Sequence, residues 1–185
     1  AAGPKDSWPC QRGFDTFYGI LDGFTNLHHP HRLVHDNHVV AVDRYPDDYF
    51  FTDDIVDRAI TTIREVKASN PAKPFFCYLS HGAVHAPLHA KAEDIERYRG
   101  AYDEGWDAIR DRRHERLQEL GIVAEGTALP PRNHEPDHDV APWDDLEPRQ
   151  KELFARYMEV YAAMVSEIDE TFGRVRSALA ELGEW

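Results

Sequence analysis

Hydrophobic residues recur at helical spacing in two long segments of this chain. Between residues 55 and 66, and again over eight turns between residues 154 and 182, apolar side chains return every three or four positions. Such a period places an apolar stripe along one face of a helix, and the stripe is expected to pack in a core. Thr52 is the expected N-cap of the first helix, and Asn70-Pro71 is its expected end.

A continuous apolar run, Phe75-Phe76-Cys77-Tyr78-Leu79-Ser80, lies between Pro74 and Gly82. Such a run is typical of a strand buried on both faces of a parallel sheet. With the preceding helix it predicts an α/β fold. A parallel sheet needs more than one such strand, and both ends of the chain look cut from a longer sequence. We therefore expect an internal part of a larger single domain.

The remaining patterns divide the chain into four parts. Residues 1–51 are rich in loops and contain one predicted hairpin with a polar turn at His35-Asp36-Asn37. Residues 52–121 form a helix–strand–helix core whose later helical stretch is broken by Gly100 and Gly105. A long loop covers 122–146, and a long helix covers 147–183 with Pro148 in its first turn.

Composition narrows the classes of partner. The chain has 34 acidic residues against 21 Lys and Arg, which gives a formal net charge of −13. This sign repels phosphate backbones and anionic lipid, so neither nucleic acid nor a membrane is an expected partner. The two cysteines, Cys10 and Cys77, form no disulfide framework, and Cys77 is expected to be a buried reduced thiol.

The stretch that follows the apolar run contains the candidate for chemistry. His85 lies just beyond the predicted strand, where α/β sheets bind their ligands, and imidazole exchanges protons near neutral pH. A structural or solvent-facing histidine is the alternative. His81, His85 and His89 have the spacing of one helix face, but Gly82 and Pro87 oppose a helix there, so we predict no zinc site.

Two further sets of polar residues are also assigned to structure. The histidines between residues 28 and 38 have no cysteine partners and no recognised ligand spacing. Paired carboxylates could bind Ca²⁺ or Mg²⁺, but here they lie in loops or at a helix N-terminus. We therefore predict no metal ligands in this chain. The pairs are Asp47-Asp48, Asp53-Asp54 and Asp144-Asp145.

Several short motifs, taken in order, resemble one known family. The segment Arg12-Gly13-Phe14-Asp15-Thr16-Phe17-Tyr18-Gly19 resembles the RGFDxFYG segment of bacterial arylsulfatases. Leu33-Val34-His35-Asp36-Asn37 resembles their LVxDN hairpin. The segment from Pro74 through His85-Ala86-Pro87 resembles their strand and HAP loop. The ordered set covers nearly the whole chain, which is similar to an internal segment of a sulfatase.

The resemblance implies part of an alkaline-phosphatase-like α/β sandwich and the hydrolysis of small-molecule sulfate esters. In that family a formylglycine from a CxPxR-type motif is the nucleophile, and a divalent cation, usually Ca²⁺, holds the sulfate. His85 matches the family's histidine at the sulfate, so it is the expected catalytic and substrate-binding residue. Cys10 lacks the CxPxR pattern. Asp53-Asp54 follows a Tyr-Phe-Phe-Thr stretch that opens a helix in the family, so it is not the family's metal-binding acidic pair. The formylglycine and the Ca²⁺ ligands are therefore expected outside this segment, which alone should be inactive.

Two alternatives remain at this point. A phosphonate monoester hydrolase or phosphodiesterase of the same superfamily would share much of the scaffold. A non-catalytic protein that kept the scaffold would belong to another class. Assays on paired aryl sulfate and aryl phosphodiester substrates separate the first from a sulfatase. For the second, the 185-residue product should show neither Ca²⁺-dependent stabilisation nor sulfatase activity.

Overall fold

The computed structural model describes residues 3–132 and 139–185. Part of the predicted loop over 122–146 therefore lies outside the described residues, as do residues 1–2. The architecture is mixed α/β, with four α-helices and one small sheet in the described part of the chain, which confirms the fold class at that level. The elements in order are η1 (Pro9–Gln11), β1 (Tyr18–Gly19), β2 (Val34–His35), β3 (His38–Val39), α1 (Phe51–Ser69), α2 (Ala92–Glu96), α3 (Gly105–Glu119), η2 (Trp143–Asp145) and α4 (Pro148–Glu181).

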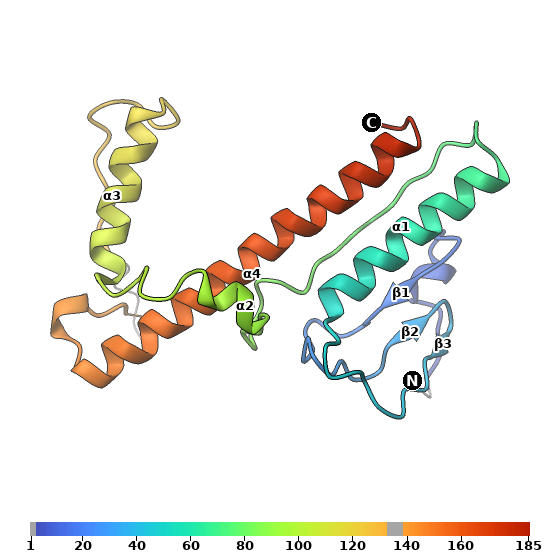
Figure 1. Cartoon of the computed structure of the whole chain (residues 1–185), viewed down its shortest axis with the longest axis horizontal. Helices are drawn as coiled ribbons and strands as arrows, with labels where there is room; N and C mark the ends of the chain where they lie inside the picture. Colours follow the sequence, from blue (N-terminus) through green and yellow to red (C-terminus); the bar gives the residue numbers. More distant parts are fainter. Residues whose placement is uncertain (1–2, 133–138) are drawn as a thin grey trace.

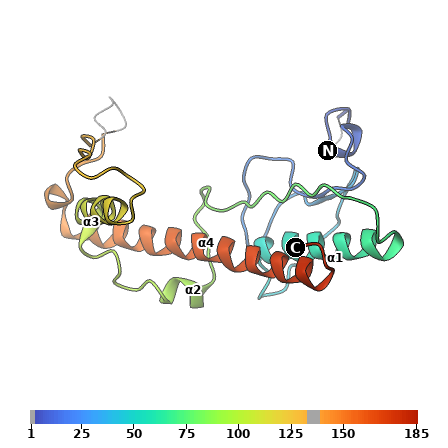
Figure 2. The same cartoon turned by 90° about the horizontal axis from the view of Figure 1, so that it is seen from above.

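The long helix α4 runs through the molecule, and the other helices are arranged along its length (Figure 1). Helix α1 lies beside its C-terminal half, α2 lies beside its middle, and α3 projects near its N-terminal end, an arrangement that Figure 2 shows from above. Pro148 occupies the first turn as predicted. A capping box between Glu147 and Gln150 satisfies backbone N–H groups that the helix itself leaves unpaired.

Helix α1 begins two residues earlier than the sequence indicates. Thr52 was the expected N-cap, but the cap position is Phe50, and Thr52 is fully buried inside the helix. Phe50 and Phe51 are each only 3% exposed, and the Phe51 N–H donates to the Leu27 carbonyl at 2.8 Å. Burial of the two aromatic rings therefore sets the start of the helix in place of side-chain capping.

The sheet has three antiparallel strands in the order β1-β2-β3. The β2–β3 hairpin with its polar turn is confirmed, and Asp36 adopts a positive φ of 53° in that turn. Strand β1 was not predicted, because two residues carry too short a pattern. The Asp36 carboxylate accepts hydrogen bonds from the Phe17 N–H at 3.0 Å and the Thr16 hydroxyl at 2.7 Å. These bonds hold the segment before β1 against the turn.

One core joins the sheet, α1 and the middle of α4. Its buried members come from loops as well as helices: Leu27 and Leu33 lie between β1 and β2, and Ala90 lies just before α2. Burial of this apolar surface is the main stabilising contribution to the arrangement. The buried residues are Leu27, Leu33, Phe50, Phe51, Ile55, Val56, Ala90, Ala163 and Met164.

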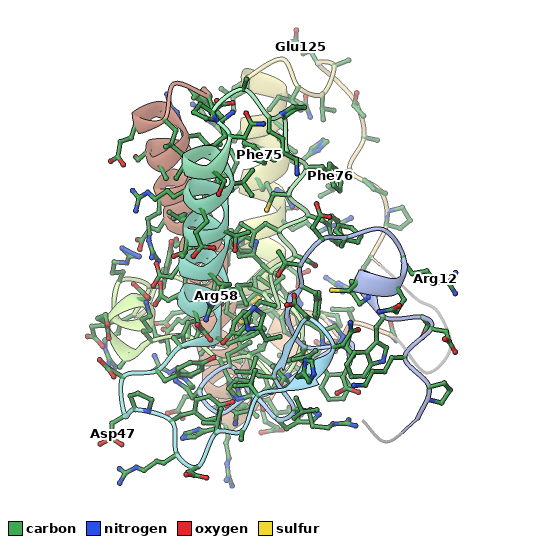
Figure 3. All side chains as sticks on the ribbon, turned by 90° about the vertical axis from the view of Figure 1, so that its right-hand side faces the viewer. Arg12, Asp47, Arg58, Phe75, Phe76 and Glu125 are labelled. Carbon is green, nitrogen blue, oxygen red and sulfur yellow. The ribbon has the colours of Figure 1, made fainter. Side chains whose placement is uncertain are left out.

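The predicted parallel strand is not confirmed. The apolar run after α1 is extended, but no described residue pairs with it in a sheet. Phe76 and Tyr78 are 79% and 74% exposed, and Cys77 is exposed where burial was expected. Figure 3 shows Phe75 and Phe76 on this segment beside α1. A strand is buried on both faces only when neighbouring strands and covering layers are present on both sides. Among the described residues, Leu79 packs against the core, but no neighbouring strand accompanies this run.

The later helical stretch is split at the glycines that were expected to break it. Gly100 and Gly105 have φ values of +72° and +84°, which residues with a Cβ rarely adopt. Helix α2 therefore ends before Gly100, and α3 starts at Gly105 and ends before Gly121, whose φ is +68°. None of the helices in the described ranges is long and apolar enough to cross a membrane.

A buried acid lies where α1, α4 and the chain entering α2 meet. Glu167 is 3% exposed, and its Oε1 lies 3.3 Å from the Lys91 ammonium without forming a hydrogen bond to any described residue. Lys91 also pairs with Asp53 at 2.5 Å. Burial raises the pKa of Glu167 to about 7 and outweighs the opposing effect of Lys91.

Glu167→Gln is expected to change how stability depends on pH. The folded state holds the Glu167 proton up to about pH 7, whereas the unfolded chain releases it at the ordinary glutamate pKa. The stability that this group contributes is therefore complete below the ordinary pKa and lost as the pH rises through about 7. Relative to wild type, the variant should gain about 1–2 kcal/mol of unfolding free energy at pH 8 and little at pH 5.

Urea unfolding of the complete protein at both pH values measures this difference. Glu152→Gln is the matched control, because Glu152 lies on the same helix and is exposed. Profiles of Glu167→Gln and wild type that run parallel between pH 5 and pH 8 would show that Glu167 does not titrate as its burial requires.

Candidate functional site

The predicted catalytic residue lies in a turn directly after the extended apolar segment. The His85 N–H donates to the Gly82 carbonyl at 3.1 Å. Gly82 lies against the side chains of Leu27 and Phe51, so a Cβ at this position would meet Leu27 at 3.2 Å. Glycine thus allows the turn to pass close to the core, and the core supports His85 from below while its side chain stays exposed.

The His85 ring has one nitrogen engaged within the chain. Its Nδ1 lies 2.5 Å from the Ala86 carbonyl oxygen. A carbonyl oxygen only accepts, so Nδ1 carries a hydrogen and donates it. The neutral ring therefore has its lone pair on Nε2, and the protonated ring has a second N–H there. This arrangement leaves Nε2 as the nitrogen that exchanges a proton with a bound molecule.

His81 anchors the same turn to α4. Its Nε2 lies 3.1 Å from the Thr171 hydroxyl oxygen. That hydroxyl donates to the Glu167 carbonyl at 2.8 Å, so its oxygen accepts from His81. Burial lowers the pKa of His81, which favours the neutral ring. His81 therefore serves to position the turn that carries His85.

His89 connects the turn to the loop between β1 and β2. The Leu27 N–H donates to His89 Nδ1 at 3.2 Å, and the ring centroids of His28 and His89 are 5.7 Å apart. Burial and, to a lesser extent, His28 lower the pKa of His89. A neutral His89 can accept the Leu27 hydrogen bond, so the site is assembled from two segments that are distant in sequence.

The three evenly spaced histidines do not share a ligand. His81 contacts Thr171, His85 contacts the Ala86 carbonyl, and His89 contacts the Leu27 N–H. Across residues 3–132 and 139–185, no group of three or more His, Cys, Asp or Glu side chains is arranged to hold a metal ion. The spacing in sequence thus gives no common face in the structure.

Both carboxylates of the acidic pair at the start of α1 make structural contacts. Asp53 pairs with Lys91 at 2.5 Å and with Arg174 at 2.7 Å. The Asp54 carboxylate accepts hydrogen bonds from the hydroxyls of Tyr18 at 2.6 Å and Tyr49 at 2.7 Å. These contacts tie β1 and α4 to α1, and they use both oxygens of Asp53 and Oδ2 of Asp54.

Cys10 is equally unsuited to act as a nucleophile. Burial, together with the neighbouring Asp36 carboxylate 3.8 Å from its sulfur, raises the pKa of the thiol. Only the thiolate is a strong nucleophile, and these surroundings disfavour it. These surroundings disfavour direct attack by the Cys10 thiol. The missing CxPxR pattern is the separate reason why no formylglycine is expected at this position.

One residue beside His85 was not singled out by the sequence. The ring of Phe24 is stacked on the His85 ring, with centroids 5.5 Å apart and planes inclined by 2°. Phe24 follows Asp22-Gly23 in a polar loop, where a large exposed aromatic side chain is unusual. An aromatic residue in a polar loop is therefore the sequence feature that could have drawn attention to Phe24. The sequence does not show that its ring contacts His85.

Comparison with known proteins gives one consistent result. The Sulfatase family model matches residues 2–185. An uncharacterized sulfatase of Schizosaccharomyces pombe is 34% identical over 97% of this chain and 34% of its own length. An arylsulfatase of Klebsiella aerogenes is 31% identical over 95% of this chain and 38% of its own length. The chain therefore spans about a third of the length of these relatives.

A solved structure shares the fold. The crystal structure titled Ps i-CgsB superposes with a TM-score of 0.57, at 20% sequence identity, over 99% of this chain and 32% of that one. At this identity the likeness concerns the backbone arrangement alone.

Proposed function

Because this chain belongs to the sulfatase family, we propose that the protein containing it hydrolyses sulfate esters and that His85 acts on the leaving group. The observation that carries the proposal is the match of the family over residues 2–185, joined to an exposed histidine in the turn after the extended segment. The family match supports the reaction class, and the surroundings of His85 support its role.

The expected chemistry of His85 follows from its hydrogen bonding. When the bond between sulfur and the leaving oxygen breaks, the electron pair stays on that oxygen and negative charge develops there. A protonated His85 donates its Nε2 hydrogen to this oxygen and neutralises the charge. The Ala86 carbonyl accepts from Nδ1, so the ring keeps its orientation while Nε2 exchanges the proton.

The described residues do not supply the rest of the site that the family implies. Asp53 and Asp54 contact basic and tyrosine side chains, and Cys10 lacks the CxPxR pattern. These residues do not fit a Ca²⁺ site or a formylglycine precursor. We therefore assign the cation ligands and the nucleophile to parts of the protein outside residues 1–185.

Paired substrates with one leaving group test the reaction class. The complete protein is assayed on 4-nitrophenyl sulfate, on bis(4-nitrophenyl) phosphate and on a 4-nitrophenyl phosphonate monoester. We expect the highest kcat/KM on the sulfate, since all three substrates release the same 4-nitrophenolate and differ in the group attacked. The 185-residue chain alone should hydrolyse none of them.

Two results would contradict the proposal. A higher kcat/KM on either phosphorus ester would indicate a phosphonate monoester hydrolase or phosphodiesterase on the same scaffold. A folded complete protein that cleaves none of the three substrates would indicate a non-catalytic scaffold. Circular dichroism of the same preparation establishes that it is folded.

A further inference from the structure

Phe24 presents an aromatic surface next to the proposed proton donor. It is 58% exposed, although it is one of the larger apolar side chains of the loop between β1 and β2. Its ring plane is nearly parallel to that of His85, at 5.5 Å between centroids. Carbon atoms in contact lie about 3.5–4.0 Å apart. The two rings are therefore offset, and part of the Phe24 face is not covered by His85.

The loop that carries Phe24 is firmly attached on its C-terminal side. Leu27 is 3% exposed in the core, and its N–H is bound by His89 at 3.2 Å. The Asn26 side chain accepts from the N–H groups of His28 and His29 at 2.9 and 3.0 Å. Thr25, the residue after Phe24, is 5% exposed and bonded to His31. Phe24 is thus an exposed ring on a backbone that is held in place. Such a ring can contact a ligand without a large loss of backbone entropy.

We propose that Phe24 is a specificity-determining residue whose uncovered face contacts the leaving group of the ester, favouring flat aromatic leaving groups over aliphatic ones. The inference rests on the proposed role of His85. A leaving oxygen that accepts from Nε2 lies near the plane of the His85 ring, and the Phe24 ring is nearly parallel to that plane. The proposal places the carbon atoms next to this oxygen against the uncovered part of the Phe24 face. Aromatic rings attract one another in offset or edge-to-face geometry, whereas an aliphatic chain gains only apolar contact.

Substrate-dependent kinetics of Phe24→Ala test this assignment. The complete protein is assayed on 4-nitrophenyl sulfate and on a linear alkyl sulfate, and each variant is compared with wild type on the same substrate. We expect kcat/KM on the aryl sulfate to fall on the order of 10-fold, mainly through KM, with a much smaller fall on the alkyl sulfate. Phe24→Tyr keeps the ring and should retain the preference.

The control is Leu21→Ala, which removes an apolar side chain of similar exposure from the same loop. It should leave the ratio of the two kcat/KM values unchanged. An equal fall on both substrates for Phe24→Ala, with kcat reduced, would overturn the inference and make Phe24 a positioning residue for His85. No change on either substrate would also overturn it.

The outcome for Phe24 is separable from that for His85. If His85→Ala abolishes turnover of both esters while Phe24→Ala shows no substrate preference, only the present inference fails. If His85→Ala leaves turnover intact, the proposed role of His85 fails first, whatever Phe24→Ala does.

Discussion

His85→Ala in the complete enzyme is expected to lower kcat on an aryl sulfate by about 10²- to 10⁴-fold, the usual contribution of a general acid. The reason is that Nε2 of His85 is the proposed proton source for the leaving oxygen. The fold should be retained, because the side chain is exposed and its contacts are the Ala86 carbonyl and the Phe24 ring. Steady-state kinetics give the effect, and thermal unfolding checks the fold.

A series of leaving groups separates proton donation from simple binding. A poor leaving group, such as 4-methoxyphenolate, depends more on protonation than 4-nitrophenolate does. The loss caused by His85→Ala should therefore be larger for the 4-methoxyphenyl ester. His38→Ala is the control, since His38 is exposed on strand β3. Near-wild-type turnover of His85→Ala would remove the residue from the mechanism, and an equal loss for all esters would limit it to binding.

Gly105→Ala is expected to destabilise the attachment of α3 to α4. A Cβ at Gly105 would lie 2.1 Å from the Trp143 ring, and the residue has a φ of +84°. Trp143 is 7% exposed, and its ring is 4.9 Å from that of Trp106, which in turn lies 5.4 Å from Phe154 of α4. The strained φ and the overlap with Trp143 together should cost about 2–5 kcal/mol.

Gly121→Ala isolates the part of this cost that comes from the backbone. Gly121 has a similar φ of +68°, but nothing lies within 4 Å of an added Cβ. It should cost only about 1–2 kcal/mol. Urea unfolding measures both variants, and hydrogen exchange of the α3 amides shows whether the loss is local. Equal costs for the two variants would mean that Trp143 does not pack against Gly105.

Much of the local structure follows from the sequence. The long helix, its Pro148 start, the hairpin turn and the break between α2 and α3 depend on neighbouring residues, since hydrophobic period, capping and positive φ act over a few positions. The family itself was accessible from an ordered set of motifs. The N-terminus of α1 was misplaced because the burial of Phe50 and Phe51 overrode the preference of Thr52 for a cap.

The burial of the apolar run at residues 75–80 could not be predicted from the local sequence. The composition of the run indicates a buried strand, but Phe76 and Tyr78 are exposed among the described residues. The chain spans about a third of the length of its relatives, and we propose that further parts of the complete protein cover these side chains. The local sequence predicts a strand with two apolar faces, but only neighbouring strands and covering helices can bury those faces.

The sequence by itself determined the long helices, the hairpin turn, the family and the choice of His85 as the candidate site residue. The tertiary structure alone decided which contacts each histidine makes, and it placed Phe24 against His85 and Glu167 beside Lys91. The reason is physical. Periodicity and capping depend on residues a few positions apart, whereas a ring stack or a raised pKa depends on which distant segments share one small volume and how far water is excluded from it.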